Sequence, residues 1–227
     1  MKELQQIIQK YMTTIKRNSL FHGISDEEIT SLMGCLHARC QEYVKEQHIL
    51  HIGDAVHEVG IVLDGNVHVV KDDFWGNASI LANISAGDVF AESYACSGSP
   101  ISEVNVVTAS KSLILWIDFS RILGTCSNSC QFHTRLIHNL ITSMGNKNRM
   151  LTKKIEHMSK RTTRDKLLSY LSAESLKAGT ASFTIAFNRQ QLADYICVDR
   201  SAMSNELSKL RTEGILDFDK NTFTLYY

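Results

Sequence analysis

Apolar residues recur along this chain with two different periods, and the changes of period divide it into three segments. Ser25 and Glu28 have the spacing of a capping box, with Ser25 as N-cap, and apolar residues follow on one helical face. After Cys40 the pattern changes to short runs that glycines interrupt at intervals of 12, 11, 11 and 11 residues. These glycines are Gly53, Gly65, Gly76, Gly87 and Gly98. Short strands at this spacing are typical of a sandwich, roll or barrel.

Within this strand-rich segment, hairpin turns are expected at Asp64-Gly65 and Gly76-Asn77, because these residues tolerate positive φ. Alternating apolar positions predict strands around Val67 and Val69. A second such run contains Ile80, Ala82 and Ile84. Residues 102–117 are rich in β-branched residues and predict a final pair of strands that closes the core.

From about residue 129 to residue 158, apolar residues return to helical spacing, in steps of 4, 3, 4, 3, 4 and 3. The residues of this seam are Ile137, Ile141, Met144, Asn148, Leu151, Ile155 and Met158. Three heptads of this kind predict a coiled coil, in which a single Asn can fix register and strand number. Leu136 and Leu140 lie off the seam and can pack on the first segment. A symmetric homodimer follows, and the alternative is a long helix packed on its own domain.

The third segment, residues 159–227, begins with a predicted helix from Thr162 to the C′ glycine Gly179. A strand at 183–187 precedes a short helix capped by Asn188, and after a turn Asp199 caps a second helix. Residues 214–227 predict a closing hairpin. The buried face of the second helix consists of Met203, Leu207 and Leu210. Helix, short turn, helix and β-wing form a winged helix-turn-helix.

The opposite face of that second helix carries mostly short polar side chains, which let a helix approach base edges in a major groove. They are Arg200, Ser201, Ser204, Asn205 and Ser208. Arg200 can pair with guanine O6 and N7, and Asn205 can pair with adenine N6 and N7. Both lie near the helix start, where base contacts of this motif concentrate. The alternative is an ordinary solvated helix face.

Four other side chains are candidates for contacts to DNA phosphates. Arg189 and Gln190 begin the preceding helix, whose N-terminal N–H groups favour anions. Lys209 lies further along the second helix, and Arg211 is a further candidate.

The two parts of the chain differ in the balance of basic and acidic residues. The 227 residues include 24 Lys and Arg and 24 Asp and Glu. Residues 1–142 carry 10 basic residues against 15 acidic ones, which leaves 14 against 9 for residues 143–227. An acidic front and a basic back predict two domains with different partners.

The sequence contains no run of 18 apolar residues, and its amphipathic start does not resemble a signal peptide. We therefore expect a cytoplasmic protein that does not enter a membrane. Six cysteines at irregular spacing are expected to be reduced thiols.

Two stretches resemble the cAMP-receptor/FNR-type (Crp/Fnr) bacterial transcription regulators: "GDVFAES" at 87–93 and "NRQQLADYICVDRSAMSNELSKLRTEGIL" at 188–216. The resemblance extends over nearly the full length. It implies an α+β chain with an effector-binding β-roll at 1–120, a dimerisation helix at 121–158 and a DNA-binding winged helix-turn-helix at 159–227. It also implies phosphate contacts by Arg189 and Gln190, and a guanine-reading Arg200. Ser201 and Asn205 replace the Glu and second Arg of the cAMP-binding branch, so a different operator is expected.

The same resemblance implies a regulator rather than an enzyme. The implied regulator acts on a pseudo-palindromic duplex in response to a small-molecule effector of unknown identity. RNA polymerase is a candidate partner of this regulator. Glu92 matches the glutamate that holds the ribose of cAMP in family members. The Arg-Ser pair that holds the cyclic phosphate is replaced within "PISEV" (100–104), where Glu103 adds a negative charge. We therefore predict that cAMP is not the effector. The expected pocket rim consists of Gly87, Glu92, Ser93 and Ser102.

Three alternatives remain. Cys35 and Cys40, together with Cys126 and Cys130, form a four-thiolate site only if the fold brings them together, and haem ligation is equally open. A metal-binding cupin-like enzyme would use ligands from His48, His51, His57 and Glu58. Positions 48 and 51 face opposite sides of a strand, so they share a barrel interior only across a bulge. A pure dimer scaffold is the third alternative, and it leaves Arg200 and Asn205 without a role.

Overall fold

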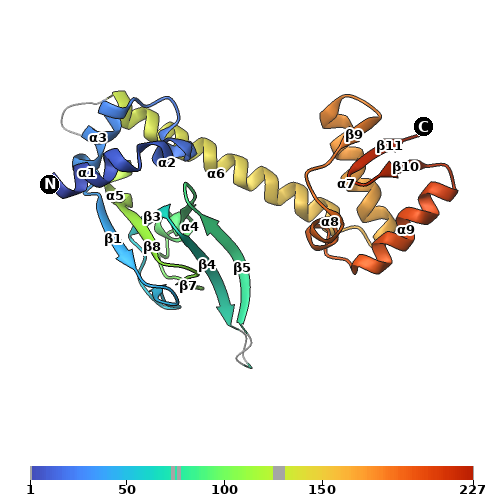
Figure 1. The fold of residues 1–227 in the computed structure, drawn as a ribbon, viewed down its shortest axis with the longest axis horizontal. Helices are drawn as coiled ribbons and strands as arrows, with labels where there is room; N and C mark the ends of the chain where they lie inside the picture. Colours follow the sequence, from blue (N-terminus) through green and yellow to red (C-terminus); the bar gives the residue numbers. More distant parts are fainter. Residues whose placement is uncertain (1, 73–74, 76–77, 125–130, 227) are drawn as a thin grey trace. The chain divides into compact units, whose positions relative to one another are not determined.

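The computed structural model describes residues 2–72, 75, 78–124 and 131–226 (Figure 1). The chain forms two compact units, Met1–Met144 and Gly145–Tyr227, and the boundary falls within one long helix. A β-roll, this helix and a helix-turn-helix with a small sheet follow one another, which confirms the predicted α+β class. None of the described helices is long and apolar enough to cross a bilayer.

Two four-stranded antiparallel sheets make the roll of the N-terminal unit. One sheet has the strand order β1-β8-β3-β6, and the other has the order β2-β7-β4-β5. The strands are β1 (Arg39–Tyr43), β2 (His48–Leu50), β3 (Glu58–Asp64), β4 (Asn66–Asp72), β5 (Ala78–Ser85), β6 (Val89–Phe90), β7 (Asn105–Thr108) and β8 (Ser112–Asp118).

Both strands predicted at 102–117 are present, as β7 and β8, but they do not pair with each other. β7 lies between β2 and β4, whereas β8 lies between β1 and β3 in the other sheet. The short link between them therefore crosses from one sheet to the other. The prediction that these two strands pair is wrong. Residue propensity predicts that a strand forms, but it does not predict which sheet the strand joins.

Strand β3 is buried on both faces. Val59, Ile61 and Leu63 face a core shared with the N-terminal helices, while Val62 belongs to the core between the sheets. Those helices are α1 (Lys2–Lys10), α2 (Met12–Arg17), the 3-10 turn η1 (Ser19–Phe21) and α3 (Asp26–Cys35) (Figure 1). The predicted capping box of α3 is confirmed. Ser25 Oγ accepts the Glu28 N–H at 3.3 Å, and the Ser25 N–H donates to Glu28 Oε2 at 2.8 Å.

A turn is present at Asp64-Gly65 between β3 and β4, but the predicted hairpin is wrong, because these two strands belong to different sheets and do not pair. Gly65 has φ +84, and a Cβ there would collide with Ser112, so glycine is required. The predicted turn at Gly76-Asn77 lies outside the described residues. In the pairing of β4 with β5, a register shift between Val69 and Val70 of β4 breaks the alternation of β5. Ile80 is consequently 61% exposed rather than on the buried face with Ile84.

After α4 (Glu92–Ala95) and α5 (Phe119–Leu123), the long helix α6 extends from Gln131 to Met158. Leu136 and Leu140 are buried in the core of the N-terminal unit, as predicted.

The C-terminal unit begins with α7 (Thr163–Ala178), whose predicted ends are confirmed. Thr162 is the N-cap, and Gly179 ends the helix in the left-handed conformation with φ +69. The strand β9 (Ser182–Thr184), the helices α8 (Arg189–Tyr195) and α9 (Arg200–Thr212), and the strands β10 (Leu216–Asp219) and β11 (Thr222–Leu225) follow. The three strands form an antiparallel sheet of order β10-β11-β9, and the β10–β11 hairpin is the predicted wing.

Candidate nucleic-acid interface

Local hydrogen bonds fix the start of α8, the start of α9 and the turn between the two helices. Asn188 and Gln191 form a capping box at the start of α8, and the Asp199 carboxylate accepts the Ala202 N–H at 2.9 Å at the start of α9. Between them, Cys197 has φ +52, and the Val198 N–H donates to the Ala193 carbonyl at 3.0 Å. These caps confirm the predicted boundaries of both helices.

The predicted buried stripe of α9 lies at the centre of the C-terminal core. Met203, Leu207 and Leu210 are each at most 1% exposed. They share one cluster with apolar residues of α7, α8 and the wing. Burial of this stripe directs the opposite face of α9 to solvent.

That solvent face carries the residues predicted to read DNA bases, and all of them are exposed. Ser201 Oγ donates to Asp199 Oδ1, and Ser204 Oγ donates to the Arg200 carbonyl at 2.9 Å. Among the described residues, no hydrogen-bond or ion-pair partner of the Arg200 or Asn205 side chain is present. The two longest polar side chains of this face are therefore available to an external ligand, with only short serines beside them.

The three predicted phosphate-binding residues differ in their surroundings. Gln190 is exposed, and its Nε2 donates to Asp194 Oδ1 at 2.8 Å. Lys209 is exposed and lies 3.5 Å from Glu206. Arg189 is half-buried, and its Cζ lies 4.6 Å from the ring centroid of Phe218 in the wing.

Sequence reasoning missed a residue that connects α9 to α7. Arg164 of α7 donates from Nη1 to Glu213 Oε1 at 3.0 Å and lies 3.4 Å from Glu206. The Arg164 hydrogen bond holds the pKa of the Glu213 carboxyl below its usual value. The separation of 49 residues between Arg164 and Glu213 left no local signal for this contact.

The predicted seam on α6 is largely solvent-exposed in the single chain. Ile141 is 65% exposed, Leu151 is 61% exposed and Ile155 is 65% exposed, whereas Ile137 packs against the N-terminal core. Thr152 Oγ1 donates to the Asn148 side chain at 3.3 Å. Large apolar side chains at this spacing form an unburied stripe on the described chain.

The four predicted effector residues occupy different environments within the N-terminal unit. The Gly87 carbonyl accepts Asn18 Nδ2 at 2.8 Å, so Gly87 lies against the N-terminal helices. Ser102 is buried, and its Oγ donates to the Val104 carbonyl at 2.7 Å. Glu92 is half-buried at the first position of α4, and Ser93 is exposed.

Aromatic side chains fill the roll between its two sheets. Phe90 and Trp116 meet edge to face with centroids 5.4 Å apart, and Trp116 Nε1 donates to the Tyr43 hydroxyl at 3.1 Å. Gly60 lies directly beneath the Phe90 ring, where a Cβ would collide with it. This part of the roll interior is packed core.

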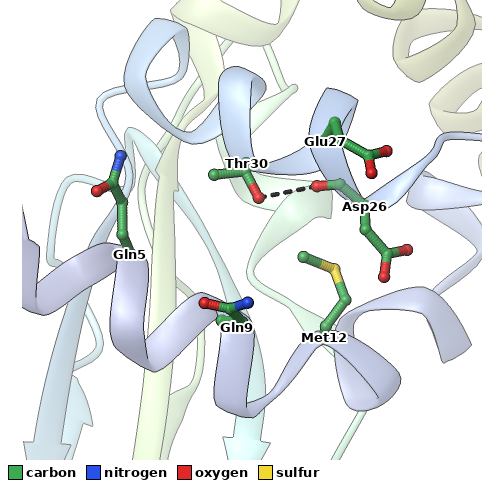
Figure 2. A pocket seen from close by; sticks show the side chains of 6 residues that line it. All are labelled: Gln5, Gln9, Met12, Asp26, Glu27 and Thr30. Atoms are coloured by element: carbon green, nitrogen blue, oxygen red, sulfur yellow. Dashed lines mark hydrogen bonds between the residues drawn. The ribbon is translucent and has the colours of Figure 1, made fainter.

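A surface pocket of about 530 Å³ lies among the N-terminal helices (Figure 2). Its lining residues are Gln5, Gln9, Met12, Asp26, Glu27 and Thr30. Figure 2 shows Thr30 Oγ1 bonded to the Asp26 carbonyl, at 2.8 Å, on the α3 side. No sequence pattern predicted this pocket, and it does not include the predicted effector residues.

The cupin-like ligand set does not come together among the residues that the structure places. They contain no group of three or more His, Cys, Asp or Glu suited to a metal ion. Cys126 and Cys130 lie outside the described residues. His48 and His51 stack with ring centroids 4.5 Å apart, because β2 has a register shift between His48 and Leu50. Both are exposed, so the bulge brings them together outside the roll interior.

Two family models match this chain. Residues 40–129 match the cyclic nucleotide-binding domain, and residues 165–225 match the Crp-like helix-turn-helix domain. The chain belongs to the Crp/Fnr family of transcription regulators. The second match covers α8, α9 and the wing, so the face that carries Arg200 lies on a Crp-like DNA-binding domain.

Solved structures show the same Crp/Fnr fold at low sequence identity. A CooA mutant from Carboxydothermus hydrogenoformans is 18% identical, with a TM-score of 0.54 over 92% of this chain and 91% of that one. DNR from Pseudomonas aeruginosa is 16% identical, with a TM-score of 0.50 over 96% and 94%. A cyclic nucleotide-binding domain from Methylobacillus flagellatus KT is 16% identical, with a TM-score of 0.56 over 70% and 87%. No curated protein sequence matches this chain.

Proposed function

We propose that this Crp/Fnr-type DNA-binding regulator acts as a homodimer whose two α9 helices enter successive major grooves of a pseudo-palindromic site. The observation that carries the proposal is the exposed α9 face, where Arg200 and Asn205 project opposite the buried Met203 stripe. Two such helices related by a two-fold axis read half-sites about one helical turn apart, roughly 34 Å.

Dimer formation is supported by the apolar stripe on α6. Exposed Ile141, Leu151 and Ile155 gain burial only if a second copy covers them, and Asn148 at a seam position favours one register. Two-fold symmetry of this contact presents both α9 helices to one duplex.

Control by a small molecule other than cAMP is supported by the chemistry of the segment 100–104. The Ser102 hydroxyl already donates to the Val104 carbonyl, and the next residue is the exposed Glu103. A carboxylate near a cyclic phosphate is repulsive, and no Arg lies between Glu92 and Lys111 to offset it. The effector shifts the equilibrium between two arrangements of the DNA-binding domains, because its affinity for the two arrangements differs.

RNA polymerase is the further partner that we predict.

Selection from a pool of randomised duplexes, with the purified full chain, tests the proposal. We expect enrichment of an inverted repeat whose half-site centres are separated by about 10 base pairs. Because the effector is unidentified, the selection is run with and without a small-molecule extract of cells. Absence of any enriched sequence in both arms contradicts the proposal, and enrichment of a single unrepeated site contradicts its dimeric part.

A further inference from the structure

One phenyl ring in the wing contacts the guanidinium groups of two arginines from different helices. The Cζ of Arg189, the first residue of α8, lies 4.6 Å from the Phe218 centroid. The Cζ of Arg211, in the last turn of α9, lies 3.8 Å from the same centroid. Phe218 is half-buried on β10, so it connects both helices of the DNA-binding motif through cation–π contacts.

The two arginines differ in their polar partners. Arg211 is anchored by an ion pair from Nε to Asp217 Oδ1 at 2.6 Å and by a hydrogen bond to the Phe218 carbonyl. In the described part of the chain, the Arg189 guanidinium has no such hydrogen bond or ion pair. Its contacts are aromatic, to Phe218 and to Phe223 at 4.9 Å. The five N–H donors of Arg189 therefore lack a protein acceptor.

Electrostatics at this point favour an anion. Burial first, and then the charge of Arg211, lower the pKa of the Arg189 guanidinium. The half-buried Arg189 and the exposed Arg211 carry like charges that repel, and Asp217 pairs only with Arg211, so an external anion beside Arg189 relieves the remaining repulsion. An aromatic ring orients a cation without neutralising it, whereas a carboxylate partner would compete with an external phosphate.

We propose that Phe218 is a positioning residue for DNA binding, whose ring holds the Arg189 and Arg211 guanidiniums at a fixed spacing for backbone phosphates. The proposal rests on the DNA-binding function above and deepens it. Phe218 itself touches no phosphate. It acts through the two arginines. Its removal leaves Arg211 anchored to Asp217 but takes away the ring that fixes the Arg189 guanidinium beside it.

The test measures binding of the full chain to a random-sequence duplex as a function of salt. Phe218→Leu and Phe218→Ile keep an apolar residue in the strand but lack the ring, whereas Phe218→Tyr keeps the ring. In the ring-less variants, the slope of log affinity against log salt should fall by about 0.9 for each phosphate that the arginines no longer neutralise. Phe218→Tyr should retain the wild-type slope.

Phe183→Leu is the matched control, because Phe183 lies in the same sheet and stacks on Phe223, and among the described residues its ring makes no cation–π contact with either arginine. A Phe218 variant with a purely structural effect would behave like this control, with lower stability and an unchanged slope. In an Arg189→Ala background, Phe218→Leu should reduce the slope by less than it does in the wild type, because the remaining Arg211 is still anchored by Asp217.

An unchanged slope in the folded ring-less variants overturns the role of Phe218 while leaving DNA binding intact. A wild-type chain that shows no salt-dependent binding to any duplex refutes the proposed function itself, and the role of Phe218 with it.

Circular dichroism shows which variants fold. If both ring-less variants fail to fold, the test uses the NMR signals of the Arg189 Nε–H group in the wild type and in Phe218→Tyr. These signals report whether the Arg189 guanidinium lies against an aromatic ring. A ring-current shift that changes when DNA is added supports the proposal, and signals at free-arginine positions overturn it.

Discussion

The Asp199 carboxylate accepts the backbone N–H of Ala202 at 2.9 Å, and this bond sets the residue at which the recognition helix α9 begins. The Ser201 hydroxyl donates to the same carboxylate oxygen. Because Ser201 and then Ala202 stabilise the charged form, the pKa of Asp199 is lowered in the folded protein. The start of the α9 face that we propose reads DNA therefore depends on one ionised side chain.

We predict that this cap makes the stability of the C-terminal unit depend on pH. A carboxyl with a lowered pKa stabilises the fold above its unfolded-state value of about 3.9, and the contribution disappears as pH falls through the folded value. Asp199→Asn keeps a capping oxygen but cannot titrate, so its unfolding should depend less on pH below about 4 than that of the wild type. Urea unfolding followed by circular dichroism measures the difference. Identical pH profiles for the two proteins would contradict this account.

The buried stripe of α9 should dominate the stability of the same unit. Leu207→Ala removes a fully buried side chain and should cost about 2–5 kcal/mol in the free energy of unfolding. Ser204→Ala, one turn earlier on the exposed face, should change it by less than about 0.5 kcal/mol. Equal effects of the two substitutions in denaturant titrations would mean that α9 does not pack as the structure shows.

The exposed seam on α6 predicts that a charge placed on it prevents dimer formation. Two matched substitutions test this prediction. Leu151→Glu places a charge on the seam, whereas Met150→Glu places the same charge one residue away, at a position that is 70% exposed and off the seam. Sedimentation velocity should show monomers for Leu151→Glu and dimers for Met150→Glu and the wild type, since a buried unpaired carboxylate disrupts the interface. A Leu151→Glu variant that remains dimeric would place the interface elsewhere.

The surroundings of Ser102 and Glu103 predict the response to cyclic nucleotide. Isothermal titration of the full chain with cAMP should give no binding in the micromolar range. The prediction fails if a micromolar dissociation constant is measured, and substitution of Glu103 by Gln would then show whether its charge weakens binding.

Signals contained within a few residues were sufficient to predict much of this fold. The caps at Ser25, Asn188 and Asp199, and the left-handed Gly179, all occur at the predicted positions, because each cap bonds to backbone no more than about four residues away. The buried stripe of α9 was equally predictable, since it follows from helical periodicity alone.

Contacts between distant strands could not be predicted in this way. The exposure of Ile80 and the stacking of His48 on His51 both result from register shifts, which depend on the partner strand. The placement of Phe218 between Arg189 and Arg211 was missed for the same reason, because it needs the wing to fold back beside the start of α8. Sequence reasoning thus found which side chains lie on the exposed face of α9 but not the contacts between distant residues that surround that face.

The most direct test of the central claim compares Arg200→Ala with Lys209→Ala on the selected operator and on a scrambled duplex, at one fixed salt concentration. Arg200→Ala should cost about 1–3 kcal/mol at one base pair of each half-site, and so lower the ratio of operator to scrambled affinity. Lys209→Ala should weaken binding to both duplexes alike and leave that ratio unchanged. If both variants instead lose the same affinity on the operator and on the scrambled duplex, the α9 face does not read sequence and the account is wrong.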